Sequence, residues 1–123
     1  MPVNVFVADD SDVIRKAIRR FLEGRPEVLI IGEAANCPET IAQVNQLLPD
    51  VIVLDLNMVD FHNPAIGFNK RLAGAKIVAI TLGIDDVASA LAESIGVDKL
   101  IDKGDLVAEL VPAILELAST KTA

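Results

Sequence analysis

The sequence predicts an α/β fold in which a doubly wound, five-stranded parallel sheet carries helices on both faces. Short apolar runs alternate with stretches of helical periodicity along the 123 residues, which is the pattern of strand–helix–strand units. Hydrophobic residues make up 52% of the chain and aromatic residues only 3%, so the core must be aliphatic. Aliphatic strands are typical of a parallel sheet that is covered on both sides.

Five apolar runs are expected to form the strands. They are residues 3–8 (VNVFVA), 28–34 (VLIIGEA), 50–56 (DVIVLDL), 76–81 (KIVAIT) and 99–102 (KLID). Each run is rich in β-branched residues or leucine and is bounded by Pro, Gly or Asp. Because parallel strands joined by right-handed crossovers all end at one edge of the sheet, the residues that follow these runs should gather at that edge.

The helices are expected over residues 12–24, 38–48, 85–96 and 104–118. Ser11 is a good N-cap for the first helix, Pro38 opens the second and Asp85 begins the helix that follows the fourth strand. The segment from 59 to 74 is the least regular, and the third helix in chain order should be short or irregular there. Residues 1–118 are expected to form one domain, and residues 119–123 a polar tail or the start of a linker.

Composition narrows the classes of function. The formal net charge of −7 disfavours direct binding to nucleic acid or to an anionic membrane surface. The single cysteine, Cys37, rules out an internal disulfide and fits a reducing compartment. The chain has neither a signal-peptide pattern at its start nor an apolar stretch of membrane-spanning length, so a cytoplasmic location is expected.

Polar residues follow or close four of the five predicted strands. Asp9 and Asp10 follow the first strand, Asp55 ends the third, Thr81 ends the fourth and Lys103 follows the fifth. Taken singly, each is explained as a turn former, a helix cap or a surface charge. Taken together they would meet at one edge of the sheet, and carboxylates that close need either a cation or a proton.

The chemistry of this residue set points to a phosphoacceptor aspartate. Hard oxygen ligands with an open position suit Mg²⁺. A carboxylate beside Mg²⁺ can accept a phosphoryl group as the nucleophile. Lys103 would then neutralise charge on the phosphoryl oxygens, and the hydroxyl of Thr81 would donate a hydrogen bond to one of them.

Four separated motifs resemble a response-regulator receiver domain, the CheY-like phosphoacceptor module of two-component signalling. They are VADDSDVIRKAIRRFLE (7–23), PDVIVLDLNM (49–58), KIVAIT (76–81) and LIDKGDLVAELVPAI (100–114), and the resemblance covers almost the whole chain. The stretch FLEGRPEVLIIGEAAN (21–36) is similar to NarL/LuxR-type receivers, whose members usually carry a C-terminal DNA-binding domain that these 123 residues do not include. The resemblance implies a flavodoxin-like sheet of strand order 2-1-3-4-5.

The resemblance also implies roles for individual residues. Asp55 would be phosphorylated by a histidine kinase in a Mg²⁺-dependent reaction. Asp9, Asp10 and Asp55 would hold the metal together with the backbone carbonyl of Asn57. A domain of this kind catalyses its own phosphorylation and dephosphorylation only weakly and is not a conventional enzyme.

The output mechanism is where the sequence departs from the family. Thr81 and Leu100 occupy the two switch positions, but Leu100 stands where the family usually has an aromatic residue. Leu82 is larger than the residue common after the switch threonine, and Val59 replaces a usual proline. The output could go to a downstream protein partner or to a DNA-binding domain outside this chain, and the sequence leaves a homodimer open.

Two other functions compete with the phosphoacceptor interpretation. The first is a pseudo-receiver that acts as a protein-interaction module without phosphorylation, which Leu82 and Leu100 favour and the complete acidic set disfavours. The second, weaker alternative is a small aspartate-based phosphatase of the haloacid dehalogenase type. Those enzymes use a D-x-D pair on the first strand, whereas Asp9 and Asp10 are adjacent.

Overall fold

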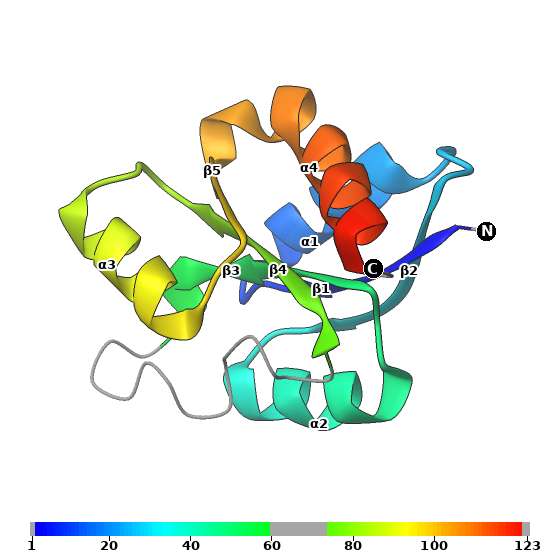
Figure 1. The fold of residues 1–123 in the computed structure, drawn as a ribbon, viewed down its shortest axis with the longest axis horizontal. Helices are drawn as coiled ribbons and strands as arrows, with labels where there is room; N and C mark the ends of the chain where they lie inside the picture. The colour runs from blue at the N-terminus through cyan, green and yellow to red at the C-terminus, as the bar shows by residue number, and fades with distance from the viewer. Residues whose placement is uncertain (1, 60–73, 122–123) are drawn as a thin grey trace.

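The computed structural model describes residues 2–59 and 74–121. Over these residues the chain forms one parallel sheet of five strands in the order β2-β1-β3-β4-β5 (Figure 1). The strands are β1 (Val3–Ala8), β2 (Val28–Ala34), β3 (Val51–Asp55), β4 (Lys76–Thr81) and β5 (Lys99–Asp102). The predicted fold class and strand order are therefore confirmed.

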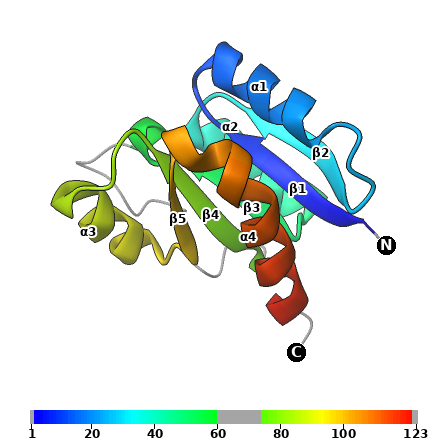
Figure 2. The same ribbon diagram turned by 90° about the horizontal axis from the view of Figure 1, so that it is seen from above.

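In the described ranges, four α-helices cover the two faces of the sheet. They are α1 (Asp12–Leu22), α2 (Cys37–Leu47), α3 (Asp86–Ile95) and α4 (Leu106–Lys121). Helices α1 and α4 pack on one face and α2 and α3 on the other, and each face has its own aliphatic core (Figures 1 and 2). The short 3₁₀ turns η1 (Leu56–Met58) and η3 (Lys103–Asp105) follow β3 and β5.

The helix starts follow from side-chain caps. The hydroxyl of Ser11 accepts a hydrogen bond from the N–H of Ile14 at 3.2 Å, and the carboxylate of Asp85 caps α3 in the same way. Helix α2 begins one residue earlier than expected, because Asn36 is its N-cap and Pro38 lies within its first turn. Local polar chemistry thus fixes where each strand–helix connection turns.

Helix α4 extends past the expected end of the domain at residue 118 and continues to Lys121, with Pro112 in its interior. The described part of the polar ending is therefore helical, while the domain boundary itself stays a prediction. The expectation of a short or irregular helix between 59 and 74 concerns residues 60–73, which lie outside the described ranges. None of the described helices is both long enough and apolar enough to cross a membrane.

The topology creates a crevice between β1 and β3. From β1 the chain moves outward to β2, then returns to the other side of β1 to form β3 and continues outward through β4 and β5. Helices on opposite faces therefore diverge above the carboxyl ends of β1 and β3, where ligands bind in doubly wound sheets. Ala8 pairs with Leu54 at this edge, so the residues that follow the two strands are neighbours.

Candidate functional site

Asp9 and Asp55 lie at the crevice between β1 and β3. Asp9 follows the last residue of β1 and Asp55 closes β3, and their side chains are 0% and 1% exposed. Asp10 is exposed beside them. One carboxylate oxygen from each of these three residues lies within 4.8 Å of the others. The sequence prediction that the three carboxylates come together is therefore met by the geometry.

Lys103, the residue directly after β5, brings a positive charge to the same place. Its Nζ lies 3.4 Å from Oδ2 of Asp9 and 3.3 Å from Oδ1 of Asp55, and only 10% of its side chain is exposed. β4 separates β5 from β3, so Lys103 contacts both aspartates only because its long side chain reaches across the edge of the sheet. One ammonium group thus contacts two of the three carboxylates.

The surroundings of Asp9 leave a single atom without a hydrogen bond. Its N–H donates to the carbonyl of Ala34 at 3.1 Å, its carbonyl accepts from the guanidinium of Arg15, and its Oδ1 accepts from the N–H of Ser11 at 2.8 Å. Oδ2 is buried and accepts no hydrogen bond from the described residues. Such an atom normally needs a partner, and here it faces Lys103 and the acidic cluster.

Asp55 is shifted toward its protonated form. The pKa of Asp55 is raised from 3.8 to about 6, chiefly by burial and also by the charge of Asp9, although Lys103 and the N–H of Asn57 act to lower it. That N–H donates to Oδ1 of Asp55 at 2.9 Å. The cause is an excess of negative charge in a desolvated place, which a divalent cation would relieve. The buried, unbonded oxygen of Asp9 and the oxygen-only donor set of the cluster fit Mg²⁺.

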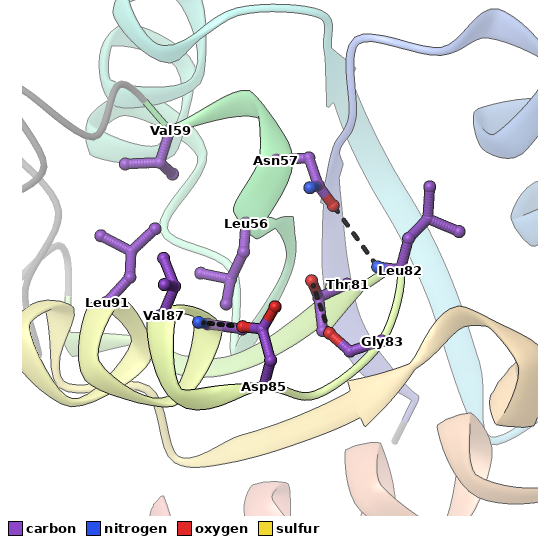
Figure 3. Close-up of a pocket in the computed structure, with 10 residues that line it drawn as sticks. Leu56, Asn57, Val59, Thr81, Leu82, Gly83, Asp85, Val87 and Leu91 are labelled. Carbon is purple, nitrogen blue, oxygen red and sulfur yellow. Dashed lines mark hydrogen bonds between the residues drawn. The ribbon is translucent and has the colours of Figure 1, made fainter.

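Thr81 stands at the end of β4 beside a cavity of about 260 Å³ (Figure 3). The side chain is 3% exposed, and its Oγ1 donates to the carbonyl of Gly83 at 3.5 Å. Leu82 is 73% exposed, and Figure 3 shows its side chain directed away from Thr81. Asn57 contacts the same loop, because its Oδ1 accepts from the N–H of Leu82 at 3.4 Å. The bulk of Leu82 therefore does not pack over Thr81.

The two expected switch residues share one face of the sheet. Leu100 pairs with Ala79, and both belong to the core on the side of α2 and α3. Thr81 lies two residues beyond Ala79 on the same strand, and successive strand side chains alternate between faces. Leu100 is thus a half-buried aliphatic member of the core diagonal to Thr81.

Sequence reasoning missed Arg15. The periodicity of α1 draws attention to its apolar positions and leaves the basic residues of this helix as a solvated face. The structure instead buries most of the Arg15 side chain, and its guanidinium bonds the backbone of Asp9. The available signal was an arginine on the second turn after the aspartate pair, where a long side chain can reach back to the end of the strand.

Fold and site together define the class of protein, a doubly wound α/β domain with an aspartate–lysine cluster at the carboxyl edge of its sheet. Residues 5–115 match the response regulator receiver domain, and the chain belongs to this family. The predicted resemblance is confirmed, and it removes the support for the aspartate-phosphatase alternative. Receiver domains are signalling domains rather than conventional enzymes.

Individual relatives agree with this assignment. The chain is 29% identical over 116 residues to the response regulator protein VraR of Staphylococcus aureus, covering 93% of this chain and 56% of VraR. It therefore spans about half the length of the curated relatives it matches. The receiver domain of NarL from Mycobacterium tuberculosis superposes with a TM-score of 0.84 at 25% identity, covering 96% of this chain and 97% of that one.

A second solved structure supports the fold alone. The receiver domain of RcsB from Salmonella enterica superposes with a TM-score of 0.82 at 21% identity, covering 96% of this chain and 89% of that one. NarL/LuxR-type receivers thus recur among the proteins similar to this chain.

Proposed function

We propose that this chain is the phosphoacceptor domain of a two-component system, in which a histidine kinase phosphorylates Asp55 in a Mg²⁺-dependent reaction. One observation carries the proposal. Oxygens of Asp9, Asp10 and Asp55 lie within 4.8 Å of one another, and Lys103 contacts both buried members of the group. A structural ion pair would need one carboxylate for one lysine, and the two additional carboxylates are explained by a cation.

The transfer step follows from the chemistry of the cluster. A carboxylate oxygen of Asp55 forms a bond to phosphorus, while the bond from phosphorus to the imidazole nitrogen of the kinase breaks and that nitrogen keeps the electron pair. When bound by Asp9, Asp10, Asp55 and the backbone carbonyl of Asn57, Mg²⁺ would neutralise charge on the carboxylates and on the phosphoryl oxygens.

Lys103 and Thr81 would bind the phosphoryl group once it is on Asp55. Lys103 already lies 3.3 Å from Oδ1 of Asp55, so its ammonium group can pair with a phosphoryl oxygen after a small movement. Within the described residues, the hydroxyl of Thr81 has one long contact of 3.5 Å, with the carbonyl of Gly83, which it could exchange for a hydrogen bond to a phosphoryl oxygen. Both groups would then favour the phosphorylated state.

The proposed output is a conformational change that a partner reads. Movement of Thr81 toward the phosphoryl group would change the packing against Leu100, which belongs to the same face of the sheet. The signal would pass to a downstream protein or to a DNA-binding domain outside this chain, as its NarL/LuxR-type relatives suggest, and homodimerisation is one form it could take. The proposal includes the cytoplasmic location expected from the sequence.

Acetyl phosphate labelling tests the proposal. The protein is incubated with acetyl phosphate and Mg²⁺, and intact mass spectrometry reports whether it gains one phosphoryl group. We expect one group on the wild type, none on Asp55→Asn, and none when EDTA removes the metal. A wild-type protein that remains unlabelled, under conditions that label a control receiver domain, would contradict the proposal.

A pseudo-receiver that signals without phosphate is the second candidate. The observation in its favour is Leu100, an aliphatic core residue at the position where the family usually has an aromatic switch residue. The two candidates differ in how the labelled protein responds. Phosphorylation that leaves the amide NMR signals of the β4–α3 loop and of β5 unchanged would favour the second candidate, and changes that spread from Thr81 to Leu100 would favour the first.

A further inference from the structure

Arg15 is a largely buried arginine beside the acidic cluster. It belongs to α1, and only 15% of its side chain is exposed. Its Nη1 donates to the backbone carbonyl of Asp9 at 2.5 Å. Arginine is seldom buried unless its donors are paired, so this contact indicates a specific role for the side chain.

Two carboxylates contact the Arg15 guanidinium through different nitrogen atoms. Nη2 donates to Asp12 in the first turn of the same helix, and Nε lies 3.6 Å from Oε1 of Glu33 on β2. Glu33 is itself held by Arg19, whose Nε lies 2.9 Å from its other oxygen. The contacts with Asp12 on α1 and Glu33 on β2 thus fix the guanidinium that binds the carbonyl of Asp9.

The carbonyl that Arg15 binds belongs to the peptide group joining Asp9 to Asp10. The carboxylate of Asp9 is held independently, by the N–H of Ser11. Asp10 is exposed, and its carboxylate makes no hydrogen bond or ion pair with another described residue. The direction in which Asp10 presents its carboxylate therefore depends on the backbone, and Arg15 fixes that backbone from its carbonyl side.

We propose that Arg15 is a positioning residue for the cation site, which holds the Asp9–Asp10 peptide group in the orientation that directs the Asp10 carboxylate toward Asp9 and Asp55. This inference rests on the proposed function, because it assigns Arg15 a role in binding Mg²⁺. Groups that orient the ligands of a metal, without touching it, commonly change metal affinity by about 10- to 100-fold when they are removed.

Charge and geometry predict opposite effects for this residue. Arg15 is a cation near a site for a divalent cation, so as a charge alone it would repel Mg²⁺, and its removal would tighten metal binding. As a positioning residue it favours the bound geometry, and its removal would weaken metal binding. The sign of the change therefore distinguishes the two roles.

The experiment compares Mg²⁺ affinity in Arg15→Ala with that in Arg19→Ala, by titration followed through the amide NMR signals of Asp10 and Ser11. The two arginines lie one turn apart on α1 and both approach Glu33, but only Arg15 contacts Asp9. We expect Arg15→Ala to bind Mg²⁺ about tenfold more weakly than the wild type. Arg19→Ala, which removes an exposed pair, should change the affinity by less than about twofold.

Two further measurements separate positioning from general damage. At saturating Mg²⁺ the rate of acetyl phosphate labelling of Arg15→Ala should return to within about twofold of the wild type, because only metal binding is weakened. Arg15→Lys keeps the charge and can donate one hydrogen bond to Asp9, so its affinity should lie between those of the wild type and Arg15→Ala. If Arg15→Ala fails to fold, Arg15→Lys tests the inference instead. A weaker Mg²⁺ affinity in this variant would arise without any change of charge.

Each outcome of these measurements either supports or overturns the positioning role of Arg15. Wild-type affinity or tighter binding in Arg15→Ala overturns the positioning role while leaving the proposed function intact. Wild-type affinity in Arg15→Lys, in the case where Arg15→Ala does not fold, overturns it as well. A wild-type protein that binds no Mg²⁺ overturns both the proposed function and this inference. Weakened binding in Arg15→Ala together with wild-type binding in Arg19→Ala supports the inference.

Discussion

The two edges of the sheet both carry aspartates, yet these aspartates have different surroundings. At the edge where strands begin, Asp50 accepts a hydrogen bond from the N–H of Asn4 at 2.9 Å, and Asp98 accepts one from the N–H of Ile77 at 2.8 Å. At the edge where strands end, the carboxylates of Asp9 and Asp55 face each other and Lys103. All four carboxylates accept a hydrogen bond from a backbone N–H, but only Asp9 and Asp55 are also gathered into a charged cluster.

This difference separates structural carboxylates from functional ones. N–H groups near the start of a strand need acceptors, and Asp50 and Asp98 supply them to the second residues of β1 and β4, so these side chains contribute to folding. The cluster of Asp9 and Asp55 instead keeps one buried oxygen without a hydrogen bond and raises the pKa of Asp55 to about 6. The cluster therefore opposes folding in the absence of a cation, which is the pattern of a binding site.

The largest expected effect comes from removing the one cation of the cluster. Lys103→Met leaves two buried carboxylates without their partner, and removing one member of a buried ion pair costs about 3–5 kcal/mol of unfolding free energy. Mg²⁺ should restore part of this loss, because it binds only the folded state. Chemical denaturation at pH 7 with and without Mg²⁺ measures both effects.

Lys99→Met is the matched control for this prediction. Lys99 is the first residue of β5, the strand that Lys103 follows, but it is exposed and takes no part in the cluster. Its substitution should change the unfolding free energy by less than about 1 kcal/mol. Equal losses in the two variants would mean that Lys103 acts as an ordinary surface lysine.

Neutralising Asp55 is expected to stabilise the protein. The pKa of Asp55 is raised to about 6 by burial and by Asp9, roughly two units above its ordinary value. At about 1.4 kcal/mol per unit, the ionised carboxylate lowers the stability by about 2–3 kcal/mol at pH 7. Asp55→Asn should recover about that amount in the absence of Mg²⁺, although it abolishes labelling.

The pH dependence of this gain follows from the same shift. Below about pH 4 Asp55 is protonated in both states, so its ionisation contributes nothing to the difference between Asp55→Asn and the wild type. Between about pH 4 and 6 the unfolded chain releases the proton while the folded protein keeps it, so the wild type loses stability as the pH rises. The advantage of Asp55→Asn should therefore grow over this interval and become constant above it. An advantage that does not vary with pH would contradict the assignment.

At the opposite edge of the sheet, substitution of an aspartate should lower the stability of the protein rather than raise it. Asp50→Ala removes the acceptor of the Asn4 N–H and should destabilise the protein by about 1–2 kcal/mol. Asp50→Asn keeps an acceptor oxygen and should lose less. Neither variant should alter Mg²⁺ affinity or acetyl phosphate labelling. A stabilised Asp50→Asn would remove the distinction between the two edges.

The five strands, the presence of helices on both faces and the gathering of the site residues could be predicted from the sequence pattern, whereas the strand order was implied by the family resemblance. The five apolar runs alternate with helical stretches, and parallel strands bring their carboxyl ends to one edge whatever the details of packing. The caps Ser11 and Asp85 were equally visible, because a capping side chain bonds only a few residues away.

The parts that escaped prediction depend on contacts between distant segments. Periodicity gave no reason to separate Arg15 from Arg19, although one reaches the backbone of Asp9 and the other only Glu33. The difference in exposure between Asp9 and Asp10 is equally invisible in two adjacent identical residues, because it depends on which side chain turns inward beneath Lys103.

The smallest expected effect is the energetic coupling between the two edges. Asp50 and Asp55 lie just before and at the end of the same strand, β3, so about 16 Å of extended backbone separates them. Changes this far apart without shared partners usually add within about 0.5 kcal/mol. The change in stability of the double variant Asp50→Asn, Asp55→Asn should therefore equal the sum of the two single changes.

Asp55→Asn combined with Lys103→Met should deviate strongly from additivity, since the two side chains are in contact. If the pair at opposite ends coupled as strongly as the pair in contact, the rigid strand would transmit the charge state of Asp55 to the far edge, and the cluster would influence the whole sheet rather than its carboxyl edge alone.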